Sequence, residues 1–293
     1  MSKGDNMTQK KNNLRHIISI VYACVLALML FLIALFIGLS FSAFNNKVIF
    51  NKVSESNYYK RVHEELLDRC KDIVVHNGLP ESILDDVITL ERVYVEGRNY
   101  IDNTLTGSNK EIQTDKLEES LRANLNDYLE LENIEVSMEV ELGIHEMIAR
   151  ITQEYQRSIE FKFVYYIALY RDYVYGIAKW LIPVVLVITI ALVVLLMNMF
   201  TYLHRGLRYI LYALVSSSIS IIAISSFLLL SGSYRNLTLE PSYYAAFIAS
   251  FLKGSISVYL YIGSMGVLLS VLVYMLIGYF KHNMTKKRKK VGA

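Results

Sequence analysis

Four long apolar blocks constrain this 293-residue chain more than any other feature. They cover residues 17–44, 179–202, 209–231 and 255–280, and none has an Asp, Glu, Lys, Arg or His in its interior. Each is long enough for a helix to cross a hydrocarbon core of about 30 Å, which needs roughly 20 residues. The first block exceeds a signal-peptide core and lacks an A-x-A-like cleavage site, so we expect it to remain as an anchor. The sequence therefore predicts four transmembrane helices.

The short flanks of these blocks predict the orientation. Residues 1–16, 203–208 and 281–293 together hold twelve Lys or Arg and one acid, Asp5. Basic flanks are retained in the cytoplasm. We therefore expect the chain to span a plasma membrane with both termini on the cytoplasmic side. Residues 45–178 and the loop 232–254 are then extracytoplasmic.

Charge separates the predicted outer segment from the rest of the chain. Residues 45–178 hold 25 acids and 15 bases, although the whole chain carries +3. No basic folded domain with stacking aromatics is visible, so we expect no nucleic-acid partner. The basic tail either holds anionic lipid headgroups or only fixes topology, and the second interpretation is favoured. Its residues are Lys286, Lys287, Arg288, Lys289 and Lys290.

The outer segment has a helical pattern throughout, which predicts an all-α fold. In "DIVVHNGLPESILDDV", Asn77-Gly78 is typical of a helix end and Pro80 of the start of the next helix. We expect this next helix to be short and to run through Val87, and we interpret Asn77, Gly78 and Pro80 as a structural hinge between the two helices. Further along, Thr89 caps a helix that stops at Gly107.

Two further expectations concern the rest of this segment. Thr114 is a candidate cap for a helix through residue 131, and the pattern from Ile144 to Ile159 runs on towards the second span without a stop. Cys24 and Cys70 fall in different regions and cannot pair, so the outer domain must be held by its own core.

The third and fourth spans carry small residues at four-residue spacing. The pairs Ser216/Ser220 and Gly266/Ser270 have the spacing that lets helix backbones approach closely. A polar pore lining is the alternative for the serines, and helix packing is favoured. Without a charged residue inside a span, a proton path is not predicted.

Residues with catalytic potential do not form a motif. His63-Glu64-Glu65 and His145-Glu146 lack the second histidine that zinc protease chemistry needs. His76 with Asp85-Asp86 lacks a spaced third ligand for a metal. We therefore predict no catalytic, cofactor-binding or metal-binding residue and no enzymatic activity.

The order "NGLPESILDDVITLERV", "YIDNTL" and "LEESLRANLNDYL" resembles a family of uncharacterised four-span membrane proteins from Gram-positive bacteria. The resemblance covers residues 55–160 and implies an architecture, with a helical extracytoplasmic domain between the first two spans. The usage of Lys, Asn, Ile and Tyr is also typical of low-GC Gram-positive bacteria. The topology alone is similar to that of FtsX/MacB-type permeases, whose external domain normally includes strands.

Two functions are compatible with these observations. The favoured hypothesis is a non-enzymatic cell-surface protein, embedded in the lipid bilayer, whose outer domain binds a ligand, an envelope component or another membrane protein as a sensor or scaffold. The alternative is a permease-like subunit that works with a separate ATPase in transport or envelope remodelling. The sequence leaves a homo-oligomer open.

Overall fold

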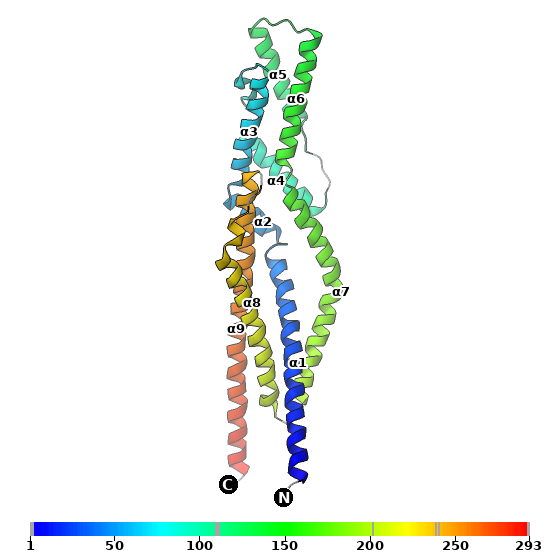
Figure 1. Ribbon diagram of the computed structural model, residues 1–293, viewed down its shortest axis with the longest axis vertical. Helices are drawn as coiled ribbons and strands as arrows, with labels where there is room; N and C mark the ends of the chain where they lie inside the picture. Colours follow the sequence, from blue (N-terminus) through cyan, green and yellow to red (C-terminus); the bar gives the residue numbers. More distant parts are fainter. Residues whose placement is uncertain (1–2, 109–111, 201, 238, 240, 292–293) are drawn as a thin grey trace. The chain divides into compact units, whose positions relative to one another are not determined.

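The computed structural model describes residues 3–108, 112–200, 202–237, 239 and 241–291, with side chains from Leu14 to His282. Over these residues the chain is all-α, as predicted, with nine α-helices, two short 3₁₀ helices and no strand (Figure 1). The elements in order are α1 (Lys3–Phe41), α2 (Asn46–Glu55), α3 (Tyr58–His76), η1 (Glu81–Leu84), α4 (Leu90–Thr106), α5 (Asp115–Leu131), α6 (Met138–Ile159), α7 (Lys162–Asn198), α8 (Leu203–Ser231), η2 (Ser233–Arg235) and α9 (Ser242–Val291).

The chain divides into two compact units. The span unit comprises Met1–Asn45, Tyr173–Leu237 and Phe251–Ala293. The polar unit comprises Asn46–Asp172 and Thr238–Ser250. Helices α7 and α9 contribute residues to both units. The loop before the fourth span therefore belongs, in part, with the long segment that follows the first span.

Four helices of the described chain are long and apolar enough to cross a membrane. They include Leu14–Phe41, Lys162–Asn198, Leu203–Ser231 and Ser242–His282. Each contains one of the predicted apolar blocks or most of it, so the prediction of a four-span membrane protein is supported by length and composition.

Apolar side chains of α1, α7 and α8 form the core of the span unit: Ala23, Leu26, Leu192, Leu196, Tyr209 and Ala213. Close approaches occur at glycines, because a Cβ at Gly38 would overlap the Tyr259 ring and one at Gly266 would overlap Ser218 Oγ. The hydroxyl of Tyr259 donates a hydrogen bond to the Leu35 carbonyl at 3.2 Å. The missing side chains of Gly38 and Gly266 thus allow these helices to approach closely.

The polar unit is built on amphipathic helices. Helix α3 packs against α4 and α6, and each of these helices buries residues three or four positions apart. In α5 the buried stripe is Leu117, Leu121, Leu125 and Leu129. This period places the apolar side chains on one face and forms a single core.

Three helices of the polar unit end in the same way. In α3, the N–H groups of Gly78 and Leu79 donate to the carbonyls of Val75 and Val74, at 3.0 and 3.2 Å. This is a Schellman motif, which needs a left-handed residue after the helix. That residue is Gly78 in α3 (φ 72°), Gly107 in α4 (φ 75°) and Asn133 in α5 (φ 53°). The predicted stops at Gly78 and Gly107 are confirmed.

The segment after Pro80 differs from the prediction. Pro80 has an extended backbone and precedes only the 3₁₀ turn η1, and the next α-helix starts at Leu90. The expected α-helix through Val87 is wrong, because Asp86 adopts a left-handed conformation (φ 57°) that a helix does not allow.

The predicted caps and the predicted long helix have mixed outcomes. Thr89 Oγ1 accepts a hydrogen bond from the Arg92 N–H at 3.2 Å, which confirms that cap. Thr114 precedes α5 but its side chain makes no capping bond. The expected run from Ile144 into the second span is wrong, since α6 ends at Ile159 and α7 starts at Lys162.

Candidate functional site

The break between α6 and α7 places an aromatic side chain in the centre of the polar unit. Phe161 is fully buried and stacks on Tyr58 of α3, with ring centroids 4.5 Å apart. It also meets Phe247 of α9 edge-on at 4.9 Å and Tyr244 at 5.4 Å. Tyr243 completes this aromatic cluster, edge-on to Tyr58 at 5.5 Å. Such pairs add favourable contacts beyond the area they bury.

A hydrogen bond explains why the helix stops here without a Gly or Pro. Glu160 has an extended backbone (φ −61°, ψ 108°), and its carbonyl accepts a hydrogen bond from the Tyr244 hydroxyl at 3.0 Å. The carbonyl that leaves the helical ladder is therefore satisfied by α9. The start of α9 is part of the polar unit's core.

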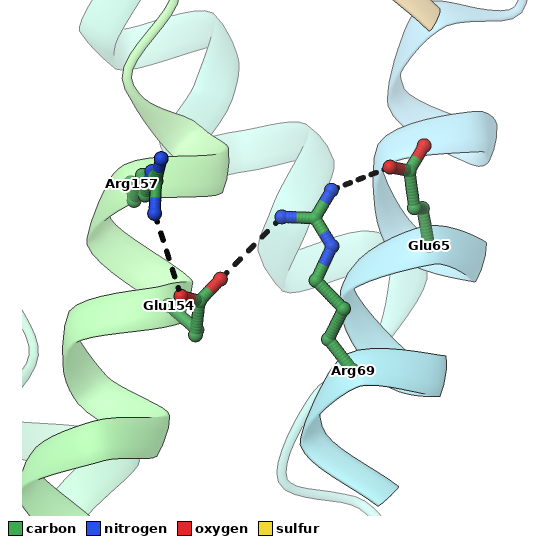
Figure 2. A network of polar contacts seen from close by, with 4 residues as sticks. All are labelled: Glu65, Arg69, Glu154 and Arg157. Carbon is green, nitrogen blue, oxygen red and sulfur yellow. Dashed lines mark hydrogen bonds and ion pairs between the residues drawn. The ribbon is translucent and has the colours of Figure 1, made fainter. Parts of the chain in front are cut away.

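Charged side chains of α3 and α6 form ion pairs with one another (Figure 2), and they line the same pocket as Tyr243 and Tyr244. The Arg69 guanidinium lies 2.5 Å from Glu65 on its own helix and 3.4 Å from Glu154 on α6. Arg157 lies 3.8 Å from the other oxygen of Glu154. Burial alone would lower the pKa of Arg69, but the Glu65 and Glu154 carboxylates raise it overall. The network therefore stabilises the charged form of Arg69.

A pocket of about 820 Å³ opens beside this network. Its charged lining consists of three cations and three acids: Arg69, Arg157, Lys162, Glu65, Asp72 and Glu154. Because these charges balance, the pocket favours neither an anion nor a cation. The ion pairs and the aromatic cluster are best explained as contacts that stabilise the packing of α3, α6 and the start of α9.

A different surface lies at the connection between α5 and α6. Every residue from Leu131 to Leu142 is exposed, including Leu131 (80%) and Met138 (86%). We call this stretch the tip surface. Its large apolar side chains are Leu131, Ile134, Val136, Met138, Val140 and Leu142. Soluble domains rarely leave such a group of apolar side chains without a partner.

Acidic residues surround these apolar side chains. Glu132, Glu135, Glu139 and Glu141 alternate with them along the chain, and Glu130 precedes them. A pocket of about 630 Å³ lies here, lined by Asn126, Leu129, Glu130, Asn133, Ile134, Glu135 and Val136. The tip surface thus combines an open groove, apolar side chains and negative charge.

The histidines and aspartates of the sequence analysis do not come together. His63 is hydrogen-bonded at 2.9 Å to the Ile88 carbonyl, which ties α3 to the segment before α4. His76, His145 and the pair Asp85-Asp86 are exposed. Among the described residues no group of three or more His, Cys, Asp or Glu could hold a metal.

Cys70 lies in the core of α3, fully buried. Burial raises the pKa of its thiol to about 12, with a smaller contribution from Glu154. Since the thiolate is the reactive form, this cysteine is unreactive while the polar unit is folded.

The residues predicted to pack helices in the span unit are partly different from those that do. Gly266 and Ser270 lie on the packed face of α9, and Ser270 is buried. Ser216 and Ser220 are exposed, so they do not pack against another helix of the described chain, and their predicted role stays a prediction. The buried serines of α8 are Ser217, Ser218 and Ser225. The basic tail Lys286–Lys290 belongs to α9, but its side chains lie outside those described.

No protein-family model, curated protein or solved structure matches this chain. The candidate sites therefore depend on geometry alone. Sequence reasoning missed both the aromatic cluster and the tip surface. The signal for the first was present in "EFKF" (160–163) and "SYYAAF" (242–247), and for the second in the alternation of glutamates and apolar residues across 130–142.

Proposed function

We propose that the chain is a non-enzymatic multi-pass protein of a bacterial plasma membrane, with both termini in the cytoplasm and the polar unit outside. In this proposal the polar unit binds another component of the cell envelope, as a sensor or scaffold. Membership of a four-span family from Gram-positive bacteria is part of the same proposal.

The packing of the polar unit supports this topology. Tyr243, Tyr244 and Phe247 lie at the start of α9, within the predicted outer segment 232–254, and share a core with Tyr58 and Phe161. Segments that share a core must lie on the same side of a membrane. Four spans put residues 45–178 and 232–254 on one side and the three basic flanks on the other.

Thiol labelling of intact cells tests the topology. The variants Glu119→Cys on α5 and His282→Cys after the fourth span introduce exposed thiols into the full chain. The background is low, because Cys70 is buried and Cys24 lies within the first span. A membrane-impermeant maleimide should label the first variant and not the second. Labelling of the second alone would reverse the proposed orientation.

The observation that carries the binding function is the tip surface. Its apolar side chains are exposed over twelve consecutive residues of the described chain, whereas α3, α4 and α5 each bury a stripe of apolar residues at helical spacing. An exposed apolar group on an otherwise well-packed domain marks an interaction site.

A photo-crosslinking amino acid tests this function in native membranes. Placed at Met138 of the full chain, it should give a defined crosslinked product, and Leu142→Ser in the same chain should abolish it. The same amino acid at the exposed Glu91 of α4 is the control and should give no such product. Equal products from both positions, or none at Met138, would contradict a binding role for the tip surface.

A further inference from the structure

The tip surface has a strong negative charge that no described Lys or Arg neutralises through an ion pair. Residues 123–149 contain seven acids and no Lys or Arg. Within the described structure, the tip glutamates Glu130, Glu132, Glu135, Glu139 and Glu141 form no ion pair. Elsewhere in the polar unit, Glu55, Glu64, Glu65, Glu81 and Glu154 each pair with a Lys or Arg.

We infer that the tip surface is a docking site for a cationic amphipathic segment of a partner polypeptide, in which Lys or Arg side chains alternate with apolar ones. This inference rests on the proposed function and specifies the chemistry of the partner. Complementary charge steers such a partner and fixes its register, while apolar contacts hold it.

The groove at the end of α5 suits a basic side chain. Leu129 is nearly buried and lines the groove together with Ile134 and Val136, while Glu130 and Glu135 supply carboxylates to its lining. A Lys or Arg side chain has an apolar stem and a charged end, so it can contact both kinds of lining at once.

The first turn of α6 supplies a second contact of the same composition. Met138 and Leu142 are four residues apart, so they lie on one helical face, with Glu139 and Glu141 beside them. An apolar side chain of the partner can rest on this face while the neighbouring glutamates receive its basic residues. The two contacts together match a segment with mixed basic and apolar side chains.

Charge argues against two other occupants. A second copy of the chain that met this surface face to face would bring acid against acid, which is unfavourable. An anionic bilayer or wall polymer would be repelled in the same way. A cationic polypeptide is the partner that both the glutamates and the apolar side chains favour.

A binding measurement on the full chain in phosphatidylcholine nanodiscs tests the inference. The probe is an 18-residue peptide of Lys and Leu, and the control peptide has Glu in place of every Lys. The Lys peptide should bind to wild type above its binding to empty nanodiscs, and the Glu peptide should not.

Two matched triple variants separate a specific site from general attraction. Glu130→Gln, Glu135→Gln and Glu139→Gln remove three charges from the tip surface. Asp68→Gln, Glu91→Gln and Glu119→Gln remove three exposed charges elsewhere on the polar unit. The tip triple should weaken binding of the Lys peptide roughly tenfold and the other triple less than about twofold. Equal losses would overturn the inference.

A third variant tests the apolar contribution. Met138→Ser with Leu142→Ser keeps every charge and should also weaken binding of the Lys peptide, by roughly fivefold. Unchanged binding would mean that only charge attracts the peptide, which would also overturn an amphipathic partner.

The outcomes distinguish this inference from the proposed function. If the Lys peptide fails to bind while the crosslink at Met138 still depends on Leu142, the tip surface binds a partner of another chemistry and only the inference fails. If particle masses show two chains that Met138→Ser with Leu142→Ser converts into one, the occupant is a second copy and the inference is overturned. If the crosslink is also absent, the proposed function fails as well.

Discussion

The two ends of helix α6 have opposite surroundings within one unit. From Met147 to Ile159 the helix buries residues at helical spacing, and Phe161 follows in the aromatic cluster. From Met138 to Glu146 every side chain is exposed except the half-buried Ile144. The helix has 22 residues, so at about 1.5 Å per residue its ends lie roughly 30 Å apart.

The difference lies in the spacing of the apolar residues. In the second part of α6 they recur every three or four positions and form one face that α3 and α4 cover. In the first part Met138, Val140 and Leu142 alternate with glutamates, which spreads apolar side chains around the helix. No single neighbouring helix of the chain can cover such a pattern. One end of α6 therefore packs in the core of the polar unit, and the other end leaves its apolar side chains exposed, as the proposed binding role requires.

Removal of the central aromatic ring should give the largest effect. Phe161→Ala leaves a cavity among Tyr58, Tyr244 and Phe247, so we expect a loss of about 3–5 kcal/mol in the free energy of unfolding of the polar unit. Cys70 provides the measurement, because its thiol reacts only after the unit opens. Pulsed thiol labelling in increasing urea, on the full chain with Cys24→Ser, reports that free energy.

The control for this prediction lies at the other end of the same unit. Leu131→Ala removes a side chain that is 80% exposed, so we expect a change within about 0.5 kcal/mol. A similar loss from both substitutions would mean that the tip surface also contributes to the core, and the contrast between the two ends of α6 would disappear.

The aromatic cluster also shows that the polar unit needs residues from the start of α9. Residues 45–178 lack Tyr243, Tyr244 and Phe247, which pack on Tyr58 and Phe161. A fragment without them exposes the centre of the aromatic cluster. An unfolded fragment would therefore say little about the domain in the full chain.

Local chemistry made part of the fold predictable from the sequence. The four spans follow from composition, and the stops at Gly78 and Gly107 follow from the freedom of glycine at positive φ. Asn133 fills the same position in α5, but asparagine adopts it less regularly and is common elsewhere, so the stop was not predicted. The end of a helix can be predicted locally when the residue found there, such as glycine, seldom occurs at other positions of a helix.

Tertiary contacts decided the rest. The break at Glu160 depends on a hydroxyl from Tyr244, 84 residues further along the chain, which no local pattern reports. The face of α8 was missed because three consecutive serines, Ser216–Ser218, leave the helical phase undefined. The tip surface was missed because an alternation of glutamates and apolar residues follows neither the period of an amphipathic helix nor any recognised motif.

A substitution at Gly78, where α3 ends, should reduce the free energy of unfolding less than a substitution in the aromatic cluster does. Gly78 has a φ of 72°, and no neighbouring atom lies within 4 Å of the position that a Cβ would take. Gly78→Val therefore strains the backbone but causes no steric clash. We expect the free energy of unfolding, measured by Cys70 labelling, to fall by about 1–2 kcal/mol. His76→Ala, two residues earlier and exposed, should change stability by less than about 0.5 kcal/mol. Equal effects would show that the loss at Gly78 is not conformational.

The ion pairs between α3 and α6 should contribute less to the free energy of unfolding than the glycine at position 78 does. Arg69→Met removes the contacts to Glu65 and Glu154 but keeps an apolar stem, so we expect a loss of about 0.5–1 kcal/mol at low salt. Added salt should reduce the difference, because these side chains are about one-third exposed or less. Lys60→Met, which breaks the exposed pair with Glu64, is the matched control and should have no measurable effect. A larger loss than that of Gly78→Val would mean that Arg69 organises the core.

The smallest effect should appear as a dependence on pH at Glu96, in the core half of the polar unit. Burial raises the pKa of this carboxyl, and the hydrogen bond from the Tyr155 hydroxyl (2.8 Å) and the charge of Arg92 offset the rise only in part. The folded state therefore binds the proton more tightly than the unfolded state. The stability that this gives is complete below the ordinary pKa of about 4.3 and is lost as the pH rises through the folded value.

Glu96→Gln keeps an acceptor for Tyr155 and removes the ionisation. At pH 7 the variant should be more stable than wild type, by less than about 0.5 kcal/mol because the side chain is only partly buried. The advantage should vanish as the pH falls towards 4, where Glu96 is protonated. Cys70 labelling is slow at that pH, so thermal melting of the full chain followed by circular dichroism is the measurement. An advantage that grows with falling pH would mean that the ionised carboxylate stabilises the fold, and the hydrogen bond from Tyr155 would then outweigh burial.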